Sequence, residues 1–235
     1  MKDKKILIVI TNHNTLNNGK ETGYWLGEVT HFYHILAEAG FEVDFASPKG
    51  SQPPLDRRSY NLQDRDNRQF WEDERLQAEL NNTIPIATVN PEDYVAIYYA
   101  GGHGAMWDFP SNEKLARVAA QIYENDGFVS AVCHGSAGLL NIKLTNGRSL
   151  LEGKTVTGFA NLEEKLIRLT NAVPYLLEDE LKKQGATYKK GIFPFIPHVQ
   201  VSDRLITGQN PQSAKAVAKT LVKSLSRSHL KEKQA

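Results

Sequence analysis

The sequence contains a single cysteine, Cys133, among its 235 residues. One thiol cannot form a disulfide within the chain, so the fold does not depend on one. A lone thiol is typical of a reducing compartment, and we expect the protein in the cytoplasm. The scarcity of thiols also directs attention to Cys133 as a residue with a chemical role.

Long apolar runs and an excess of charge of either sign are also missing. The apolar run at residues 6–10 is too short for the core of a signal peptide, and no stretch approaches the roughly 18–20 apolar residues of a membrane span. Lys and Arg number 28 against 27 Asp and Glu, so the net charge is +1. We therefore expect neither a nucleic-acid nor a membrane partner, because phosphate binding requires a basic patch.

Cofactor motifs are absent as well. The first strand is not followed by G-x-G-x-x-G, and the sequence has no G-x-x-x-x-G-K-[ST] pattern. Glu28, His31 and His34 stand three residues apart on one predicted helix, but only adjacent pairs share a helix face well. We therefore expect no cofactor and no dedicated metal site.

What the sequence does contain is a regular alternation of strands and helices. Strands are predicted at 5–10, 41–47, 94–100, 127–132, 154–159 and 204–208. Helices are predicted at 25–39, 112–125 and 211–224, and a helical region at 161–184 is interrupted near Pro174. Continuous apolar, β-branched runs are typical of strands buried on both faces. The pattern predicts an α/β fold with a doubly wound, mostly parallel sheet between helices.

The same alternation indicates the domain organisation. Residues 1–225 form one predicted α/β domain, and residues 226–235 a basic C-terminal tail. Residues 48–90 interrupt the alternation of strands and helices with prolines and a dense run of charged residues. We interpret this segment as a small inserted cap with a helix around 68–80. Ser111 is the predicted N-cap of the helix at 112–125.

The segment FVSAVCHGSAGLLN carries the clearest chemical pattern. A hydrophobic strand ends on Cys133, and small residues allow a sharp turn into a helix, as in the G-x-S-x-G elbow of hydrolases. The elbow exposes the sulfur at the carboxyl edge of the sheet and leaves backbone N–H groups for an oxyanion. A helix N-terminus and the imidazole of His134 predict a thiol pKa below the free value of about 8.5. A buried structural cysteine is the alternative.

Two further groups are candidates for the same site. GGHG at 101–104 follows another predicted strand, where Gly101 and Gly102 amides could face the sulfur and His103 could line the pocket. A plain turn explains this motif equally well. Glu28 falls among apolar positions of the first helix, and a buried glutamate with a raised pKa can shuttle protons. The alternative is a solvated helix charge.

Taken together, these segments resemble one family. AVCHGSAGLL, YAGGHGAMWDFP, ETGYWLGEVTHFYHILAEAGFEVDFASPKG and DRLITGQNPQSA are similar to the ThiJ/PfpI superfamily, which has a flavodoxin-like, class I glutamine amidotransferase-like fold. More narrowly, they resemble its heat-shock-chaperone-type branch of glutathione-independent glyoxalases (glyoxalase III). The similarity runs from Ile6 to about Leu221. Phe32, where a proline often stands, and the segment 191–204 depart from the pattern.

The resemblance implies roles for particular residues. Cys133 would be the nucleophile, with His134 beside it and Glu28 as an acidic partner. A second acid would orient the histidine, and we place it at Glu164, with Glu163 as the alternative. Gly101, Gly102 and the His134 amide would form the oxyanion site.

The implied reaction is conversion of methylglyoxal and related 2-oxoaldehydes to 2-hydroxy acids such as lactate, through a Cys133 hemithioacetal, with protein deglycation as a related activity. The substrate would be a small aldehyde, and the protein a homodimer. Two alternatives stay open: a holdase chaperone with an apolar dimer surface, and a cysteine amidase or peptidase using the same elbow.

Overall fold

The fold is described from a computed structural model, in residues 5–232. Within that range the central sheet has the strand order β3-β2-β1-β4-β5-β9-β8. The strands are β1 (Lys5–Val9), β2 (Val43–Ser47), β3 (Ile84–Pro85), β4 (Tyr94–Tyr99), β5 (Phe128–Val132), β8 (Val199–Ser202) and β9 (Leu205–Gly208). Every neighbouring pair is parallel except β8 and β9. This arrangement confirms the predicted doubly wound, mostly parallel sheet.

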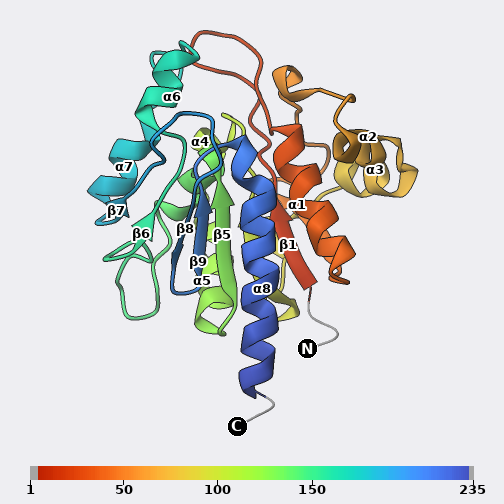
Figure 1. The fold of residues 1–235 in the computed structure, drawn as a ribbon, viewed down its shortest axis with the longest axis vertical. Helices are drawn as coiled ribbons and strands as arrows, with labels where there is room; N and C mark the ends of the chain where they lie inside the picture. The colour runs from red at the N-terminus through yellow and green to blue at the C-terminus, as the bar shows by residue number, and fades with distance from the viewer. Residues whose placement is uncertain (1–4, 233–235) are drawn as a thin grey trace.

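The central strands are buried because helices cover both faces of the sheet. Every residue of β4 and of β5 is buried, as a strand between two helical layers requires. The helices are α1 (Leu26–Glu38), α2 (Arg65–Glu72), α3 (Glu74–Asn81), α4 (Ala105–Asp108), α5 (Glu113–Glu124), α6 (Asn161–Leu166), α7 (Leu177–Lys183) and α8 (Ala214–Glu232). Figure 1 shows α1 and α8 side by side in front of the sheet, with α5 behind it.

Several elements differ from the sequence-based expectations. The strand predicted at 154–159 is reduced to β6 (Thr155–Val156), which pairs with β7 (Thr187–Tyr188) in a separate two-stranded sheet. The region predicted as helical at 161–184, with an interruption near Pro174, forms two short helices, α6 and α7, on either side of that proline. Helix α5 is capped by Asn112, whose Oδ1 accepts from Leu115 N at 2.9 Å, and not by Ser111. Ser111 bonds back to the Trp107 carbonyl instead.

Residues 48–90 contain two helices where one was predicted. Asp73 ends α2 and caps α3, with its Oδ1 accepting from Leu76 N at 3.0 Å, so the predicted helix at 68–80 is divided. Phe70, Leu76 and Leu80 are buried and hold the two helices to the body of the protein. Figure 1 shows α2 and α3 beside α1. The description of residues 1–225 as one domain with an inserted segment stays a prediction.

The last helix is longer than predicted. Helix α8 continues to Glu232, so the predicted tail that begins at residue 226 is helical as far as that residue. Residues 233–235 of that predicted tail lie outside the described residues. None of the helices in residues 5–232 has the length and apolar character needed to cross a bilayer.

The order of the strands locates the functional edge of the sheet. The chain runs outward from β1 to β3 on one side and from β4 to β9 on the other, so the direction reverses between β1 and β4. Open α/β sheets bind ligands in the crevice at such a reversal, outside the carboxyl ends of the strands. Gly101 follows β4 and Cys133 follows β5 at that edge.

Candidate active site

Cys133 stands at a sharp bend between β5 and the 3₁₀ helix η4 (Cys133–Leu139). Its φ is +57°, in the left-handed region that residues other than glycine rarely adopt, and such strain is typical of functional sites. Gly135 allows the bend because a Cβ there would lie 2.2 Å from the Tyr99 carbonyl oxygen. The predicted elbow is therefore present, with the Cys133 side chain at the sheet edge.

The Cys133 sulfur is the first member of a hydrogen-bonded chain that includes a histidine and a glutamate. His134 Nδ1 lies 3.3 Å from Cys133 Sγ, and His134 Nε2 lies 2.7 Å from Glu164 Oε2. All three residues are buried. With Nε2–H donating to the carboxylate, Nδ1 faces the thiol as an acceptor, which is the geometry of a nucleophile, its base and an orienting acid.

The neighbouring Glu163 has a different set of partners. Its Oε1 accepts from Phe195 N at 2.7 Å and from Asn210 Nδ2 at 2.9 Å, and its Oε2 accepts from Ala160 N at 3.0 Å. These bonds tie Glu163 to the backbone at Ala160 and Phe195 and to the side chain of Asn210. Of the two glutamates that the sequence offered, Glu164 is the one that contacts His134.

The chain of hydrogen bonds continues beyond Glu164 into the inserted segment. His103 Nε2 lies 3.0 Å from Glu164 Oε1, and Arg58 Nη2 lies 3.3 Å from His103 Nδ1. A guanidinium can only donate, so His103 Nδ1 accepts and its proton is on Nε2, facing Glu164. Asp56, which is buried, holds Arg58 through Oδ1 to Nε at 2.9 Å and Oδ2 to Nη2 at 2.5 Å.

These contacts determine the protonation states of His103 and Glu164. Burial and then the neighbouring His134 lower the pKa of His103 to about 4, so its imidazole is neutral at neutral pH. Burial would raise the pKa of the Glu164 carboxyl, but His134 and His103, which face it, hold that pKa well below its usual range. Glu164 is therefore a fixed carboxylate between two imidazoles.

Glu28 also lies next to Cys133. It is fully buried on α1, and its Oε2 accepts from Gly101 N at 2.7 Å. A Cβ placed on Gly101 would lie 2.6 Å from Glu28 Oε2 and 3.0 Å from Cys133 Cβ, so the three residues are closely packed. Glu28 Oε1 is buried without a hydrogen-bond partner among the described residues. The alternative of a solvated helix charge is excluded.

Burial raises the pKa of both Glu28 and Cys133. It raises the pKa of Glu28 to about 8, against the opposing effect of the Gly101 N–H. It also raises the pKa of the Cys133 thiol well above its usual value, and the Glu28 carboxylate adds to the rise. The sequence-based expectation of a lowered thiol pKa is wrong, because it left out both causes. Ionisation of the Glu28 carboxyl therefore disfavours ionisation of the Cys133 thiol.

The same contacts correct the predicted oxyanion site. Gly101 N–H is occupied by Glu28, so it does not face a substrate oxygen. Gly102, at φ +106°, lines the cavity beside His103 and Cys133. A side chain at Gly102 would collide with the Gly23 carbonyl at 2.2 Å, which makes glycine necessary there.

A cavity of about 360 Å³ opens over the sulfur. Its walls are largely apolar, with the one permanent cation, Arg58, among its lining residues. The lining consists of Trp25, Arg58, Gly102, His103, Cys133, His134, Phe159, Ile167, Phe195, Pro211 and Gln212. Phe159 covers the His134 ring at a centroid distance of 4.4 Å. A cavity of this size and polarity accommodates a small molecule with few polar groups.

Comparison with known proteins places this site in a family. Residues 22–224 match the DJ-1/PfpI family. The chain belongs to the DJ-1/PfpI family. The glutathione-independent glyoxalase HSP31 of Saccharomyces cerevisiae is 34% identical, over 93% of this chain and 96% of the yeast protein. Glyoxalase 3 of Candida albicans is 29% identical, over 93% of this chain and 97% of that protein.

Comparison with solved structures gives the same result. REP24 of Francisella tularensis superposes with a TM-score of 0.91 at 39% identity, covering 94% of this chain and 99% of that one. Glyoxalase III from Candida albicans gives a TM-score of 0.86 at 28% identity, over 94% and 97% of the two chains. The resemblance to the glyoxalase branch of the DJ-1/PfpI family is confirmed.

Some residues of this DJ-1/PfpI site could not be found from the sequence. Asp56 and Arg58 lie in the inserted segment, about 75 residues before Cys133, in no recognisable motif. Phe195 lies in the segment 191–204, which departs from the family pattern; its φ is +60°, and it lines the cavity. The only local signal was Asp56 before the 3₁₀ helix η1 (Arg57–Ser59), where its side chain caps Arg58 N.

In residues 5–232, two groups of side chains have ligand atoms close enough to hold a metal ion. One is His103, His134 and Glu164, and the other is His31, Asp64 and Asp66. Glu28 belongs to neither, since it bonds Gly101, so a site built on Glu28 and His31 is not formed. The hydrogen bonds of the first group account for its geometry without an ion.

The raised pKa of Glu28 predicts a dependence of stability on pH. Unfolding returns this carboxyl from about 8 to its ordinary pKa near 4, so between these values the folded state holds a proton that the unfolded state releases. Stability therefore falls as pH rises through this window. In Glu28→Gln that fall is reduced, by on the order of 3 kcal/mol between pH 5 and pH 8.5.

Urea unfolding of both proteins at the two pH values measures this difference. Glu38→Gln is the matched control, because Glu38 is exposed on the same helix. Wild-type and Glu28→Gln curves that shift in parallel with pH would show that Glu28 is ionised in the folded protein.

Proposed function

We propose that this protein is a glutathione-independent glyoxalase, which converts methylglyoxal and related 2-oxoaldehydes to 2-hydroxy acids without a cofactor. The observation that carries the proposal is the placement of the Cys133 thiol between the imidazole of His134 and the protonatable carboxyl of Glu28. The names of the relatives in yeasts support the same conclusion.

The first step forms a bond between sulfur and the aldehyde carbon. His134 Nδ1, 3.3 Å from Sγ, takes the thiol proton as the sulfur attacks, and Glu164 stabilises the imidazolium that results. This transfer matters because burial disfavours a free thiolate. The imidazolium then passes that proton to the aldehyde oxygen, which becomes the hydroxyl of a hemithioacetal and leaves His134 neutral. The N–H groups of Gly102 and His134 are our candidates for stabilising the oxygen as its negative charge develops.

The second step moves a proton between the two carbons of the former dicarbonyl. A base removes the proton from the sulfur-bearing carbon, the electron pair forms an enediol, and the neighbouring carbon receives a proton in return. The first carbon is thereby oxidised and the second reduced, so no external oxidant is needed. A pKa of about 8 makes Glu28 able to accept and return a proton near neutral pH.

The third step releases the product. The rearrangement leaves a thioester of a 2-hydroxy acid on Cys133, and water cleaves its carbon–sulfur bond to give the acid and the free thiol. His134 can deprotonate that water and return the proton to sulfur. The net reaction adds one water to the 2-oxoaldehyde, so atoms and electrons balance.

A holdase function is the second candidate, because several large apolar side chains are exposed. They lie on α6 and in the segment 191–196, and are Leu162, Leu166, Ile192, Phe193 and Ile196. The same surface supports our expectation of a homodimer. We also place the protein in the cytoplasm, on the evidence of its single, buried and unpaired thiol.

The test of the proposed function is formation of lactate from methylglyoxal by the purified protein, without glutathione and with a metal chelator present. We expect turnover under these conditions. Small amides assayed in parallel test the amidase alternative. Amide hydrolysis without lactate formation would overturn the glyoxalase proposal, and so would an inactive protein that still suppresses aggregation of an unfolded client.

We further propose that Arg58 is a positioning residue of this site. Its charge opposes protonation of His103, after the larger effect of burial, and its N–H fixes the tautomer that faces Glu164. In Arg58→Gln the pKa of His103 rises, and a protonated His103 weakens the hold of Glu164 on His134. We expect kcat to fall roughly tenfold and the acid limb of the kcat/KM profile to move to higher pH.

Two other variants complete that experiment. Arg58→Lys keeps the charge but not the paired bonds to Asp56, so its acid limb should stay near that of the wild type. Arg57→Gln is the matched control, since the Arg57 side chain is 87% exposed and pairs with Glu21. An unchanged acid limb in Arg58→Gln would limit Arg58 to a structural role.

A further inference from the structure

A second cavity, of about 530 Å³, is lined in part by Tyr24. It shares no lining residue with the catalytic cavity. Its walls come from the loop after β1, the loop at 52–55, and helices α2 and α3. They are Asn12, Asn14, Tyr24, Gln52, Pro53, Pro54, Leu55, Trp71, Gln77, Leu80 and Asn81. The proposed glyoxalase reaction makes no use of this cavity.

The chemistry of the lining is unusual for this chain. None of its eleven residues is charged, although 55 of the 235 residues are Lys, Arg, Asp or Glu. Five are Asn or Gln, which number only 26 in the whole sequence. Primary amides both donate and accept hydrogen bonds without charge. A phosphate or carboxylate would find no cation here, so the lining favours a neutral ligand with many hydrogen-bonding groups.

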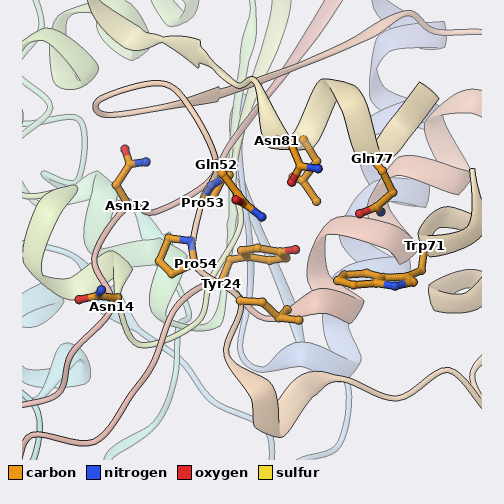
Figure 2. A pocket seen from close by; sticks show the side chains of 11 residues that line it. Asn12, Asn14, Tyr24, Gln52, Pro53, Pro54, Trp71, Gln77 and Asn81 are labelled. Atoms are coloured by element: carbon orange, nitrogen blue, oxygen red, sulfur yellow. The ribbon is translucent and has the colours of Figure 1, made fainter. Parts of the chain in front are cut away.

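Two aromatic rings form one side of the cavity. Figure 2 shows the rings of Tyr24 and Trp71 edge-on, with the amides of Gln52, Gln77 and Asn81 all on the same side of them. Trp71 is half-buried and is braced by Tyr60, whose ring meets it edge to face at 5.0 Å. A flat apolar surface opposite a row of amides fits a ligand with an apolar face and polar edges.

Several polar groups of the lining have unused hydrogen-bonding capacity. Among the described residues, no partner is present for the Tyr24 hydroxyl, the Trp71 Nε1–H, or the Gln52 and Asn81 amides. The Tyr24 side chain is nevertheless 2% exposed, and burial raises its pKa, so the hydroxyl stays neutral. Asn12, in contrast, is fixed by Lys49 N and the Gly50 carbonyl.

We propose that this cavity binds a neutral saccharide. The C–H face of a sugar ring would pack on Trp71, while its hydroxyl groups would bond the amides of Gln52, Gln77 and Asn81. Hydroxyls are donors and acceptors at once, which matches amides and leaves no charge to be compensated. The volume is enough for one or two sugar rings. The site is independent of the proposed glyoxalase reaction.

Saturation-transfer NMR on the full-length protein tests this proposal, with glucose, N-acetylglucosamine and maltose as probes. We expect saturation transfer from the protein to at least one of them, and at least tenfold weaker binding in Trp71→Ala, which loses the stacking surface. Gln69→Ala, an exposed amide on the same helix but outside the cavity, should bind like the wild type. Methylglyoxal turnover should be unchanged in both variants.

The double variant Gln52→Ala/Asn81→Ala keeps the test decisive if Trp71→Ala does not fold, because both amides are exposed. It should weaken saccharide binding by several-fold. The proposal is overturned if no probe binds at tens of millimolar, or if binding is unchanged in both cavity variants. Binding of a proline-containing peptide in place of the sugars, lost in Trp71→Ala, would make the cavity a peptide site.

Discussion

Replacement of Cys133 by serine should abolish 2-oxoaldehyde turnover, with kcat reduced at least ~10³-fold in a protein that remains folded. The hydroxyl would occupy the position of the sulfur, 3.3 Å from His134 Nδ1 in the wild type. A serine hydroxyl is far harder to deprotonate than a thiol, and here it would face the buried carboxyl of Glu28. An alkoxide beside that carboxyl would cost more than a thiolate does.

The measurement is single-turnover lactate formation, with urea unfolding as the control for folding. The variant should also retain the bent backbone at residue 133, because serine and cysteine have similar requirements at positive φ. Near-native turnover in a folded Cys133→Ser protein would remove the sulfur from the mechanism. Client-holding activity that survives this substitution, with turnover lost, would show that the two activities are separate.

Glu28→Gln should reduce kcat by about 10²–10⁴-fold while KM changes little. A glutamine can keep the bond from Gly101 N, now 2.7 Å to Glu28 Oε2, through its carbonyl oxygen. Its amide cannot take a proton at neutral pH, so the transfer between the two substrate carbons loses its shuttle. The cavity walls do not change, since Glu28 is buried behind Cys133 and does not line them.

Substrate deuterated at the aldehyde carbon identifies the affected step. In Glu28→Gln the isotope effect on kcat should be large, because proton transfer then limits the rate. A variant that is slow but shows no isotope effect would place the defect in thioester hydrolysis. A KM raised in proportion to the loss of kcat/KM would instead indicate that Glu28 helps to bind the substrate.

The part of the site that lies next to a strand end could be predicted from the sequence. Cys133 follows an apolar strand and precedes small residues, and both signals are local. The parallel sheet then brings the ends of β4 and β5 together at one edge, which places the glycines at 101 and 102 near the sulfur. Glu28 was found because its helix has apolar neighbours on the same face.

The other parts of the site depend on contacts between distant residues, which no local sequence pattern specifies. Arg58 reaches His103 across 45 positions of sequence, and only the path of the inserted segment brings them together. The thiol pKa was predicted with the wrong direction for a similar reason: a helix N-terminus is visible in a sequence, whereas burial and the facing carboxyl of Glu28 are not. Strand β8 was missed because its residues at an exposed antiparallel edge lack a continuous apolar run.

Two adjacent glutamates on α6 link the width of the substrate cavity to the reach of the base. Glu163 is bonded to the backbone of Phe195, which lines the cavity, and Glu164 is bonded to His134. An aldehyde bulky enough to push Phe195 outward would pull on α6 and so draw the imidazole from the sulfur. Such a substrate could occupy the cavity and still react slowly, so size selection would act on the rate of the chemical step and not only on entry.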